Sequence, residues 1–144
     1  MASESPAGTR MRIAEFAFPG PLRDALVAAV LSGRKTTTTA LLEEYRVEGE
    51  ALPRRGERQR VVDSDGAVVA VIETTDVRVL PLSEVDDRHA VDEGEGHADV
   101  AEWRAAHEQF WNSDELRAAL GRPVTIDDAT PVVAERFHVV ERFV

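Results

Sequence analysis

The pattern of apolar and polar residues has a period of two over three long segments, which predicts three β-strands. Two of them, 58–63 and 67–80, are joined at Asp65-Gly66, a dipeptide typical of a tight hairpin turn. The second is rich in Val and Ile and is expected to be central in its sheet. The third covers 131–143, where two sets of side chains alternate: Val133, Glu135, Phe137 and Val139 against Ala134, Arg136, His138 and Val140.

Other segments have the longer period of helices. In the first, Leu22, Leu26 and Val30 share one face, and Gly33 stands where a left-handed residue commonly ends a helix. Ser83 is expected to cap the second helix. The predicted helices cover 22–32, 83–92, 98–111 and 113–120, with a short strand at 11–18 before them and an extended segment after Lys35. Strands at both ends and in the middle, with helices inserted, predict an α+β fold built round a small mixed β-barrel or sheet.

At 144 residues, the chain has the length of one ordinary domain. Residues 1–10 are small and polar and are expected to form a disordered tail, so that a single domain covers 11–144. The sequence has no cysteine, which excludes disulfides, iron–sulfur clusters and thiolate zinc sites. It also lacks an apolar stretch of about 18 residues. We therefore expect a soluble, cytoplasmic protein that does not bind a membrane.

The net charge of −10 is distributed unevenly along the chain. Acidic residues dominate 83–115, and such a surface would repel a long polyanion, so duplex DNA is not an expected partner. A short basic strip lies at 54–60 and is a candidate for contact with the phosphates of short single-stranded RNA. Its arginines are Arg54, Arg55, Arg58 and Arg60.

Lys35 is the only lysine among 17 basic residues, and it follows Gly33 and Arg34 and precedes the four threonines 36–39. A partly buried lysine can act as a base or activate a neighbouring hydroxyl, whereas arginine keeps its proton. The segment follows a predicted helix end, and functional groups are commonly held on loops by a rigid scaffold. The alternative is that an arginine-rich composition leaves few lysines and that the threonines only favour an extended backbone.

Paired acids between glycines form a second candidate, Asp92-Glu93-Gly94-Glu95-Gly96-His97. Glycine allows the backbone to approach a pocket closely, and a carboxyl group placed there can act as a general acid or base. A solvated acidic loop is the alternative. His89, Glu93 and His97 are spaced by four, but the glycines interrupt the helix that would align them, so we expect no metal and no cofactor.

A stripe of aromatic and polar residues marks the predicted helix at 98–111: Trp103, Arg104, His107, Phe110 and Trp111. Aromatic residues at helical spacing usually pack in a core, and Phe110 and Trp111 are assigned there. Arg104 and His107 have a second interpretation, in which they line a cleft and contact a base or a phosphate.

Six motifs in order resemble the ASCH domain, a family whose β-barrel is related to the RNA-binding PUA domains. Gly33-x-Lys35-x-x-Thr38 matches the GxKxxT signature of that family. The other five are Leu52-Pro53-Arg54-Arg55-Gly56, Val71-Ile72-Glu73-Thr74-Thr75, Glu93-Gly94-Glu95-Gly96, Trp103-Arg104-x-x-His107 and Glu135-Arg136-Phe137. The resemblance spans about Glu15 to Val140, and it implies a small PUA-like mixed β-barrel with inserted helices.

The resemblance also implies a candidate reaction. One small bacterial branch of the family is an amidohydrolase that deacetylates N4-acetylcytidine with a Lys, a Thr and a Glu, which correspond here to Lys35, Thr38 and Glu93. By this analogy Lys35 takes the proton of Thr38, the Thr38 hydroxyl attacks the amide, and Glu93 donates a proton to the leaving nitrogen. The residues expected to hold the substrate are Arg34, Glu95, Trp103, Arg104 and His107.

This chain is longer than that branch, and it has His97 where relatives of its own branch usually have Asp after Glu-Gly-Glu-Gly. Two other functions are therefore open. Many members resemble non-catalytic RNA-binding modules, in which the basic strip would contact RNA, and another member is a ribonuclease that would use the same cleft. The acidic charge favours a nucleoside or short single-stranded RNA as partner. The sequence leaves the oligomeric state open.

Overall fold

The computed structural model describes residues 11–143, so the predicted tail at 1–10 lies outside the described residues. Five strands form one mixed sheet in the order β1-β3-β4-β5-β2. They are β1 (Arg12–Ala14), β2 (Thr37–Leu41), β3 (Arg58–Val62), β4 (Val68–Pro81) and β5 (Pro131–Arg142). β1 and β3 are parallel and the other pairs are antiparallel. The predicted α+β fold with a mixed sheet is confirmed, and the sheet is an open half-barrel with β1 and β2 at its edges.

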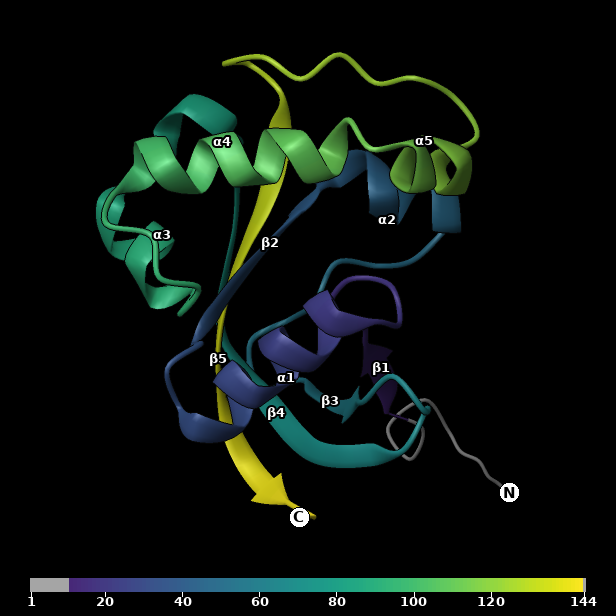
Figure 1. Ribbon diagram of the computed structural model, residues 1–144, viewed down its shortest axis with the longest axis vertical. Coiled ribbons are helices and arrows are strands. Elements are labelled where there is room, and N and C mark those ends of the chain that lie inside the picture. The colour runs from purple at the N-terminus through teal and green to yellow at the C-terminus, as the bar shows by residue number, and fades with distance from the viewer. Residues whose placement is uncertain (1–10, 144) are drawn as a thin grey trace.

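Strands β4 and β5 run the length of the molecule, and helices surround them in two groups (Figure 1). One group is α1 (Pro21–Ser32), which lies near β1 and β3. The other contains α2 (Leu42–Glu48), the 3-10 turn η2 (Leu82–Glu84), α3 (Asp87–Asp92), α4 (Val100–Trp111) and α5 (Asp114–Leu120). No helix among residues 11–143 is both long and apolar enough to cross a bilayer.

Two separate hydrophobic clusters are buried against the sheet, one beside α1 and one under the other helices. Phe16, Val30 and Phe137 belong to the cluster beside α1. The second cluster lies under the other helices and contains Trp103 and Trp111, which confirms that Trp111 is a core residue. The chain therefore has two small cores on one continuous sheet, and the ends of α1 and α3 meet between them.

Several predicted helix ends are confirmed. Gly33 ends α1 with a φ of 85°, and of the two candidate caps for the helix that ends at Leu120, Asn112 and Ser113, it is the Ser113 hydroxyl that accepts the Leu116 amide, at 3.2 Å. The prediction that Ser83 caps a helix is wrong, because Ser83 lies in η2. Asp86 is the N-cap of α3, and its carboxylate accepts the His89 amide at 2.9 Å. An Asp at this position satisfies an amide that the first helical turn leaves without a partner.

Two other segments differ from the prediction. The strand expected at 11–18 ends at Ala14, because the chain turns at Ala17 (φ 65°) before Pro21 begins α1. Helix α2 carried no prediction from the sequence. Its first turn is fixed by the Glu44 carboxylate, which accepts the Leu41 amide at 2.8 Å, and it ends at a left-handed Gly49.

Candidate functional site

Two turns that are distant in sequence pack directly against each other, one after α1 and one after α3. The Thr36 amide donates to the Asp92 carbonyl at 2.8 Å. Gly94 has a φ of 70°, and a Cβ placed on it would lie 2.5 Å from the Arg34 carbonyl oxygen. Glycine is therefore required at residue 94 both by its backbone conformation and by the close approach of the other turn. This contact sets the position of Lys35 relative to Glu93.

The Lys35 and Glu93 side chains meet between these turns, and each is only 1% exposed. The Lys35 Nζ lies 3.6 Å from Glu93 Oε1 and 3.3 Å from Glu95 Oε2, and it donates to the Thr37 carbonyl at 2.9 Å. Lys35 and Glu93, whose relative position the sequence leaves open, thus lie side by side in the folded chain. Burying two charges costs free energy that only good geometry offsets, so a buried pair of this kind is a candidate for function rather than for stability alone.

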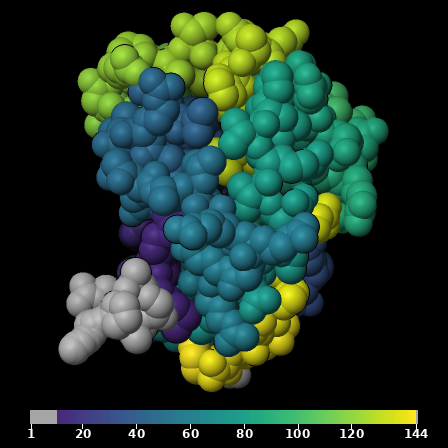
Figure 2. Space-filling model, turned by 180° about the vertical axis from the view of Figure 1, so that it is seen from behind, coloured from purple at the N-terminus to yellow at the C-terminus, as the bar shows by residue number. Residues whose placement is uncertain are grey.

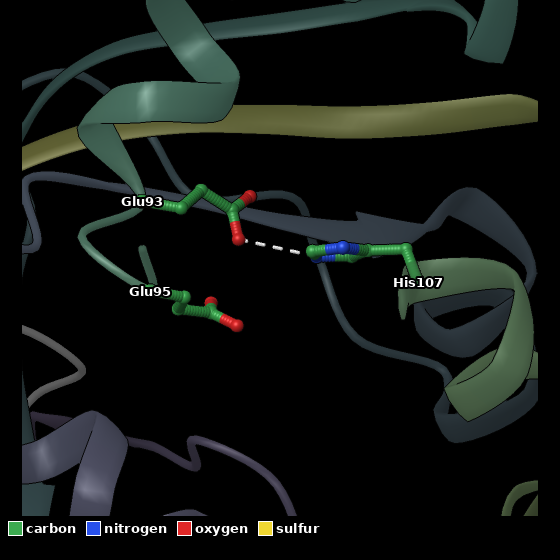
Figure 3. A group of neighbouring side chains, drawn as sticks. All are labelled: Glu93, Glu95 and His107. Carbon is green, nitrogen blue, oxygen red and sulfur yellow. Dashed lines mark ion pairs between the residues drawn. The ribbon is translucent and has the colours of Figure 1, made fainter. Parts of the chain in front are cut away.

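Glu93 is the centre of a larger polar network. Its Oε2 accepts the Thr39 hydroxyl at 2.7 Å, and its Oε1 lies 3.1 Å from His107 Nε2. Figure 3 shows Glu93, Glu95 and His107 pointing toward one another from the turn after α3 and from α4. The His89 Nε2 lies 2.7 Å from the Thr39 hydroxyl. We call this network the Glu93 cluster: Lys35, Thr39, His89, Glu93, Glu95 and His107.

The contacts of His107 define its protonation state. Its Nδ1 lies 2.9 Å from the Trp103 carbonyl, which can only accept, so Nδ1 carries a hydrogen. Its Nε2 faces the Glu93 carboxylate and needs a hydrogen there as well. Both ring nitrogens therefore donate, which makes His107 an imidazolium. Its ring also stacks on Trp103, with 4.3 Å between the ring centroids.

The charges in the cluster shift the pKa values of its members in different directions. Burial alone would raise the pKa of Glu93, but the Lys35 charge, the contact with His107 and the His89 ring 3.6 Å away outweigh it and hold that pKa well below its ordinary value. Burial would lower the pKa of His107, but its hydrogen bond to Glu93 outweighs burial and raises that pKa. Burial raises the pKa of Glu95, and Lys35 opposes this effect only in part. Glu93 is thus ionised, and His107 holds its proton.

Thr38 lies on the other face of β2. Successive side chains of a strand point to opposite faces, and Thr37 and Thr39 both bond toward α3 and its following turn. Thr38 pairs with Glu135 across the β2–β5 ladder, so these two side chains share a face. Among residues 11–143, no side-chain hydrogen bond joins Thr38 to Lys35 or Glu93. The structure thus brings together two of the three residues expected to be catalytic.

Glu135 forms a second buried polar group on that face, the Glu135 cluster of Gln59, Thr74 and Glu135. Its Oε2 accepts the Thr74 hydroxyl at 2.6 Å and the Gln59 amide at 3.3 Å. Burial raises the pKa of Glu135, and the Thr74 hydrogen bond opposes this effect only in part. Its two hydrogen-bond partners carry no charge, and the charges of Arg12 and Lys35, which lower the pKa of Glu135, do not outweigh burial.

The other residues expected to hold a substrate differ in position. Glu95 and His107 lie in the Glu93 cluster, and Trp103 is fully buried beneath His107. Arg104 does not reach the cluster, because its guanidinium bonds Glu108 at 2.8 Å and Asp128 at 2.6 Å. Arg34 is exposed and donates to Ser32. These two arginines therefore do not converge with the rest.

Most of the basic strip lies on the surface between α2 and the start of β3, on the face seen in Figure 2, whereas Arg60 is half-buried and donates to the Met11 carbonyl at 3.1 Å. Arg54, Arg55 and Arg58 are exposed. Arg58 bonds Glu73 at 3.0 Å, and Arg55 lies 4.0 Å from Asp76, so acidic neighbours offset part of the positive charge. A surface pocket of about 270 Å³ lies elsewhere, beside α2, and its lining includes no member of the Glu93 cluster.

Glu93, Glu95 and His107 also have the spacing of a metal site, since their ligand atoms lie within 4.8 Å of one another. The Lys35 Nζ already lies 3.6 Å and 3.3 Å from the two carboxylates. A metal ion there would be repelled by the ammonium group and would have to displace it. We therefore assign no metal to these residues.

Sequence reasoning missed Thr39, His89 and Glu135 as members of polar clusters. The alternation of a strand could have shown that Thr37 and Thr39 share a face, once β2 was recognised. The residues that contact this face could not be found in this way, because they lie far away in the sequence: His89 follows Thr39 by 50 positions.

Comparison with known proteins agrees with the resemblance found in the sequence. The profile of the ASCH domain family matches residues 15–141. A crystal structure of a protein from Enterococcus faecalis is 30% identical, covers 82% of this chain and 68% of its own, and gives a TM-score of 0.70. That of an ASCH domain from Lactobacillus crispatus is 29% identical, covers 83% of this chain and 73% of its own, and gives a TM-score of 0.71. No curated protein matches the chain.

Proposed function

Because the chain belongs to the ASCH domain family, we propose that it binds a cytidine-type nucleoside at the Glu93 cluster and hydrolyses an acyl group from the exocyclic nitrogen. The observation that carries this proposal is the buried Lys35–Glu93 pair, with 3.6 Å between Nζ and Oε1. It forms where the GxKxxT segment and the Glu-Gly-Glu-Gly segment pack on each other. An ammonium, an imidazolium and two carboxyl groups in one place supply the acids and bases that amide hydrolysis needs.

Each charged group suits a particular step of that reaction. The Lys35 Nζ is directed at oxygen acceptors, and the carbonyl oxygen of an acyl group is a further acceptor on which negative charge develops. Glu93 is ionised, so it suits the acceptance of a proton better than the donor role expected from the sequence. His107 keeps its proton and is suited to protonate the leaving nitrogen, and Glu95, whose pKa is raised by burial, lies beside Lys35 at 3.3 Å. The nucleophile is a threonine hydroxyl of β2.

An aromatic pair beside the cluster is suited to hold the base. Phe18 is 40% exposed, and its ring lies 6.0 Å from that of Phe110, one turn after His107 on α4. Phe16, in the same loop as Phe18, lies below Lys35, with 5.7 Å between Nζ and the ring centroid. Stacking on an aromatic ring contributes about 1–3 kcal/mol per base in single-stranded complexes. Phe110 thus has a surface role in addition to its expected core role.

Incubation of the purified protein with N4-acetylcytidine, with cytidine release followed by chromatography, tests the proposal. We expect turnover by the wild type and its loss in Lys35→Ala. Arg78→Ala is the matched control, because it removes an exposed cation of β4 outside the Glu93 cluster and should leave turnover intact. Lys35→Ala leaves Glu93 buried without its ammonium partner, so the double variant Lys35→Met/Glu93→Gln, which leaves no buried charge at these two positions, is tested beside it. Absence of turnover in the wild type would remove the proposal.

RNA binding through the basic strip is the second candidate, supported by the exposure of Arg54 and Arg55 before β3 and of Arg58 at its start. It predicts that the chain binds short single-stranded RNA with an affinity that falls as the salt concentration rises. Reversing the charges of the strip (Arg54, Arg55, Arg58 and Arg60) should abolish this binding. The ion pairs with Glu73 and Asp76 reduce the charge available for this contact. Analysis of RNA products from the same incubation separates simple binding from ribonuclease action.

A further inference from the structure

We propose that Phe18 and Phe110 form the entrance to the Glu93 cluster, and that a planar base enters by separating the two rings and lies between them. The identity of this ligand rests on the proposed function, whereas the entrance rests only on contacts within the chain. Lys35 and Glu93 are both buried. A ligand therefore reaches their charged atoms only if part of the surrounding structure opens.

The members of the Glu93 cluster differ in exposure, and the difference locates the side that faces solvent. The Lys35 and Glu93 side chains are 1% exposed, whereas those of His107 and Glu95 are 12% and 21% exposed. Phe110 follows His107 by three positions on α4, and side chains with this spacing are neighbours on a helix surface. Phe110 therefore lies beside the part of the cluster that comes closest to solvent.

Phe18 reaches Phe110 from the loop between β1 and α1. The centroids of the two rings are 6.0 Å apart. Two residues earlier in the same loop, the buried Phe16 lies under Lys35, with 5.7 Å between its ring centroid and Nζ. The loop thus connects the buried end of the cluster at Lys35 to the more exposed side at Phe110. The contact of the two rings also joins the elements around α1 to α4 (Figure 1).

The backbone of this loop is fixed, so the side chain of Phe18 is the part that can move. Ala17 has a left-handed φ of 65°, and its carbonyl accepts from Arg23 Nη2 at 2.8 Å and from Nε at 3.2 Å. This turn places Phe16 in the core and leaves Phe18 40% exposed. Phe110 packs partly against the core under α4. Rotation of the exposed Phe18 ring, a motion of nanoseconds or less, therefore opens the contact.

The spacing of the two rings in this structure excludes a base. Their centroids are 6.0 Å apart, and their planes are tilted by 38°. A flat ring stacked on both phenylalanines needs about 3.5 Å on each side, which amounts to about 7 Å between the phenylalanine rings. The rings must therefore separate by about 1 Å and become parallel before a base fits.

A base held between the rings can direct its amide inward. An acyl group on the exocyclic nitrogen is conjugated with the base and lies close to its plane. Stacking fixes that plane, so the acyl group can extend edge-on from between the rings toward His107 and Lys35. A bulky or non-planar amide, such as an acetylated sugar, needs a wider opening. The pair therefore favours flat heterocyclic substrates.

Lys35 is the only lysine of the chain, so its reaction with an amine reagent reports the opening of the cluster at one atom. The first test measures the rate of Lys35 acetylation by an N-hydroxysuccinimide ester, followed by peptide mass spectrometry. Phe18→Ala should raise this rate about 2–10-fold, as expected for loss of one aromatic contact. Phe143→Ala is the matched control, because it removes another exposed phenylalanine, directly after β5, and should leave the rate unchanged. Equal rates in Phe18→Ala and the wild type would overturn the entrance.

A reversible lock tests the same contact during turnover. The chain has no cysteine of its own, so the side chains of Phe18→Cys/Phe110→Cys can be joined by a short bis-methanethiosulfonate cross-linker and released with dithiothreitol. We expect the joined form to hydrolyse N4-acetylcytidine about tenfold more slowly, or less, than the same variant after reduction. Its Lys35 should also be acetylated more slowly. A joined form that matches the reduced form in both rates would contradict the proposal.

The two readouts distinguish failure of the entrance from failure of the hydrolase. A wild type without turnover removes the hydrolase, and the base as its ligand, while the acetylation rates still decide whether Phe18 and Phe110 cover the cluster. Wild-type turnover that persists in the joined form removes the entrance and leaves the hydrolase standing. If Phe18→Ala is not folded by circular dichroism, the joined and reduced forms of the cysteine variant decide.

Discussion

Glu93 and Glu135 are both buried carboxyl groups, and they stand on opposite faces of the β2–β5 pair, yet they have opposite protonation preferences. Glu93 is surrounded by an ammonium, an imidazolium and a hydroxyl, and its pKa is held well below the ordinary value. Glu135 accepts from a hydroxyl and an amide, and its pKa is raised. The two groups are about equally buried, with residue exposures of 1% and 5%.

The difference shows that burial alone does not decide the charge of a carboxyl group. Burial penalises the ionised form on both faces, and only opposite charges within a few ångströms reverse the result. A site that holds an ionised carboxylate beside two cations is suited to proton transfer, whereas a carboxyl group between uncharged hydrogen-bond donors is suited to joining strands. We therefore place the chemistry on the Glu93 side and treat the Glu135 cluster as structural.

The largest expected effect is a difference in stability between Glu93→Gln and Glu135→Gln. Removal of the Glu93 charge leaves the buried Lys35 with only the less buried Glu95 at 3.3 Å, and breaking a buried pair costs up to about 3–5 kcal/mol. Glu135→Gln keeps the shape of the side chain and its contacts with uncharged partners, and should change the free energy of unfolding by less than about 1 kcal/mol. Urea denaturation at pH 7 measures both, and equal losses would show that the two carboxyl groups are equivalent.

The second effect concerns the turn after α3, which holds Glu93 next to Lys35. Gly94→Ala introduces both an unfavourable φ and a clash with the Arg34–Lys35 peptide, whereas Gly96→Ala introduces only the φ penalty, because nothing lies within 4 Å of its Cβ. The φ penalty is about 1–2 kcal/mol, and the clash should add roughly 1–3 kcal/mol. Thermal unfolding of the two variants checks this order. A Gly96→Ala variant as unstable as Gly94→Ala would mean that the close approach is unimportant.

The third effect is a pH dependence of opposite sign for the two carboxyl groups. Glu93 has a lowered pKa, so its contribution to stability is present above the ordinary value of 4.5 and is lost as pH falls through the folded-state value. Glu135 has a raised pKa, so its ionisation destabilises the fold progressively as pH rises from 4.5 through its folded-state value. The destabilisation by Glu93→Gln should therefore shrink in acid, and Glu135→Gln should gain stability relative to the wild type as pH rises. Unfolding free energies between pH 3 and pH 8 test this pattern, and curves of the same sign would contradict it.

The smallest expected effect is a shift in the titration of His107. Its pKa is raised above 6.5 by Glu93, so its contribution to stability is present below 6.5 and is lost as pH rises through the folded-state value. Histidine ring signals in NMR spectra should give a midpoint above 6.5 in the wild type, a lower one in Glu93→Gln and an unchanged one in Glu135→Gln. A midpoint that does not respond to Glu93→Gln would mean that the 3.1 Å contact is not an ion pair.

Much of the fold follows from local sequence patterns. The β3–β4 hairpin, β5, the end of α1 at Gly33 and the cap of α5 at Ser113 each depend on a period or on a residue at one turn, and all are confirmed. Local patterns failed where two signals competed, as with Ser83 and Asp86, both of which are good caps. They also missed α2, whose start depends on a contact between Glu44 and the backbone of Leu41.

The candidate site was only partly predictable for a different reason. Lys35 and Glu93 could be named from their unusual settings and from the family signature, and the structure brings them together. Which threonine faces Glu93 depends on the first residue of β2, since a shift of one position exchanges the two faces. Sequence composition sets no such register, so Thr39, His89 and the separate environment of Glu135 appear only in the folded chain.

The most direct measurement is the initial rate of cytidine release from N4-acetylcytidine by the wild type, Glu93→Gln and Glu135→Gln, each confirmed to be folded by circular dichroism at the assay temperature. Our account predicts that Glu93→Gln lowers kcat by about 100-fold or more, as expected for loss of an acid–base group, and that Glu135→Gln keeps the rate within about threefold of the wild type. A loss of activity confined to Glu135→Gln, or equal losses in both variants, would contradict our assignment of the chemistry to the Glu93 side of the sheet.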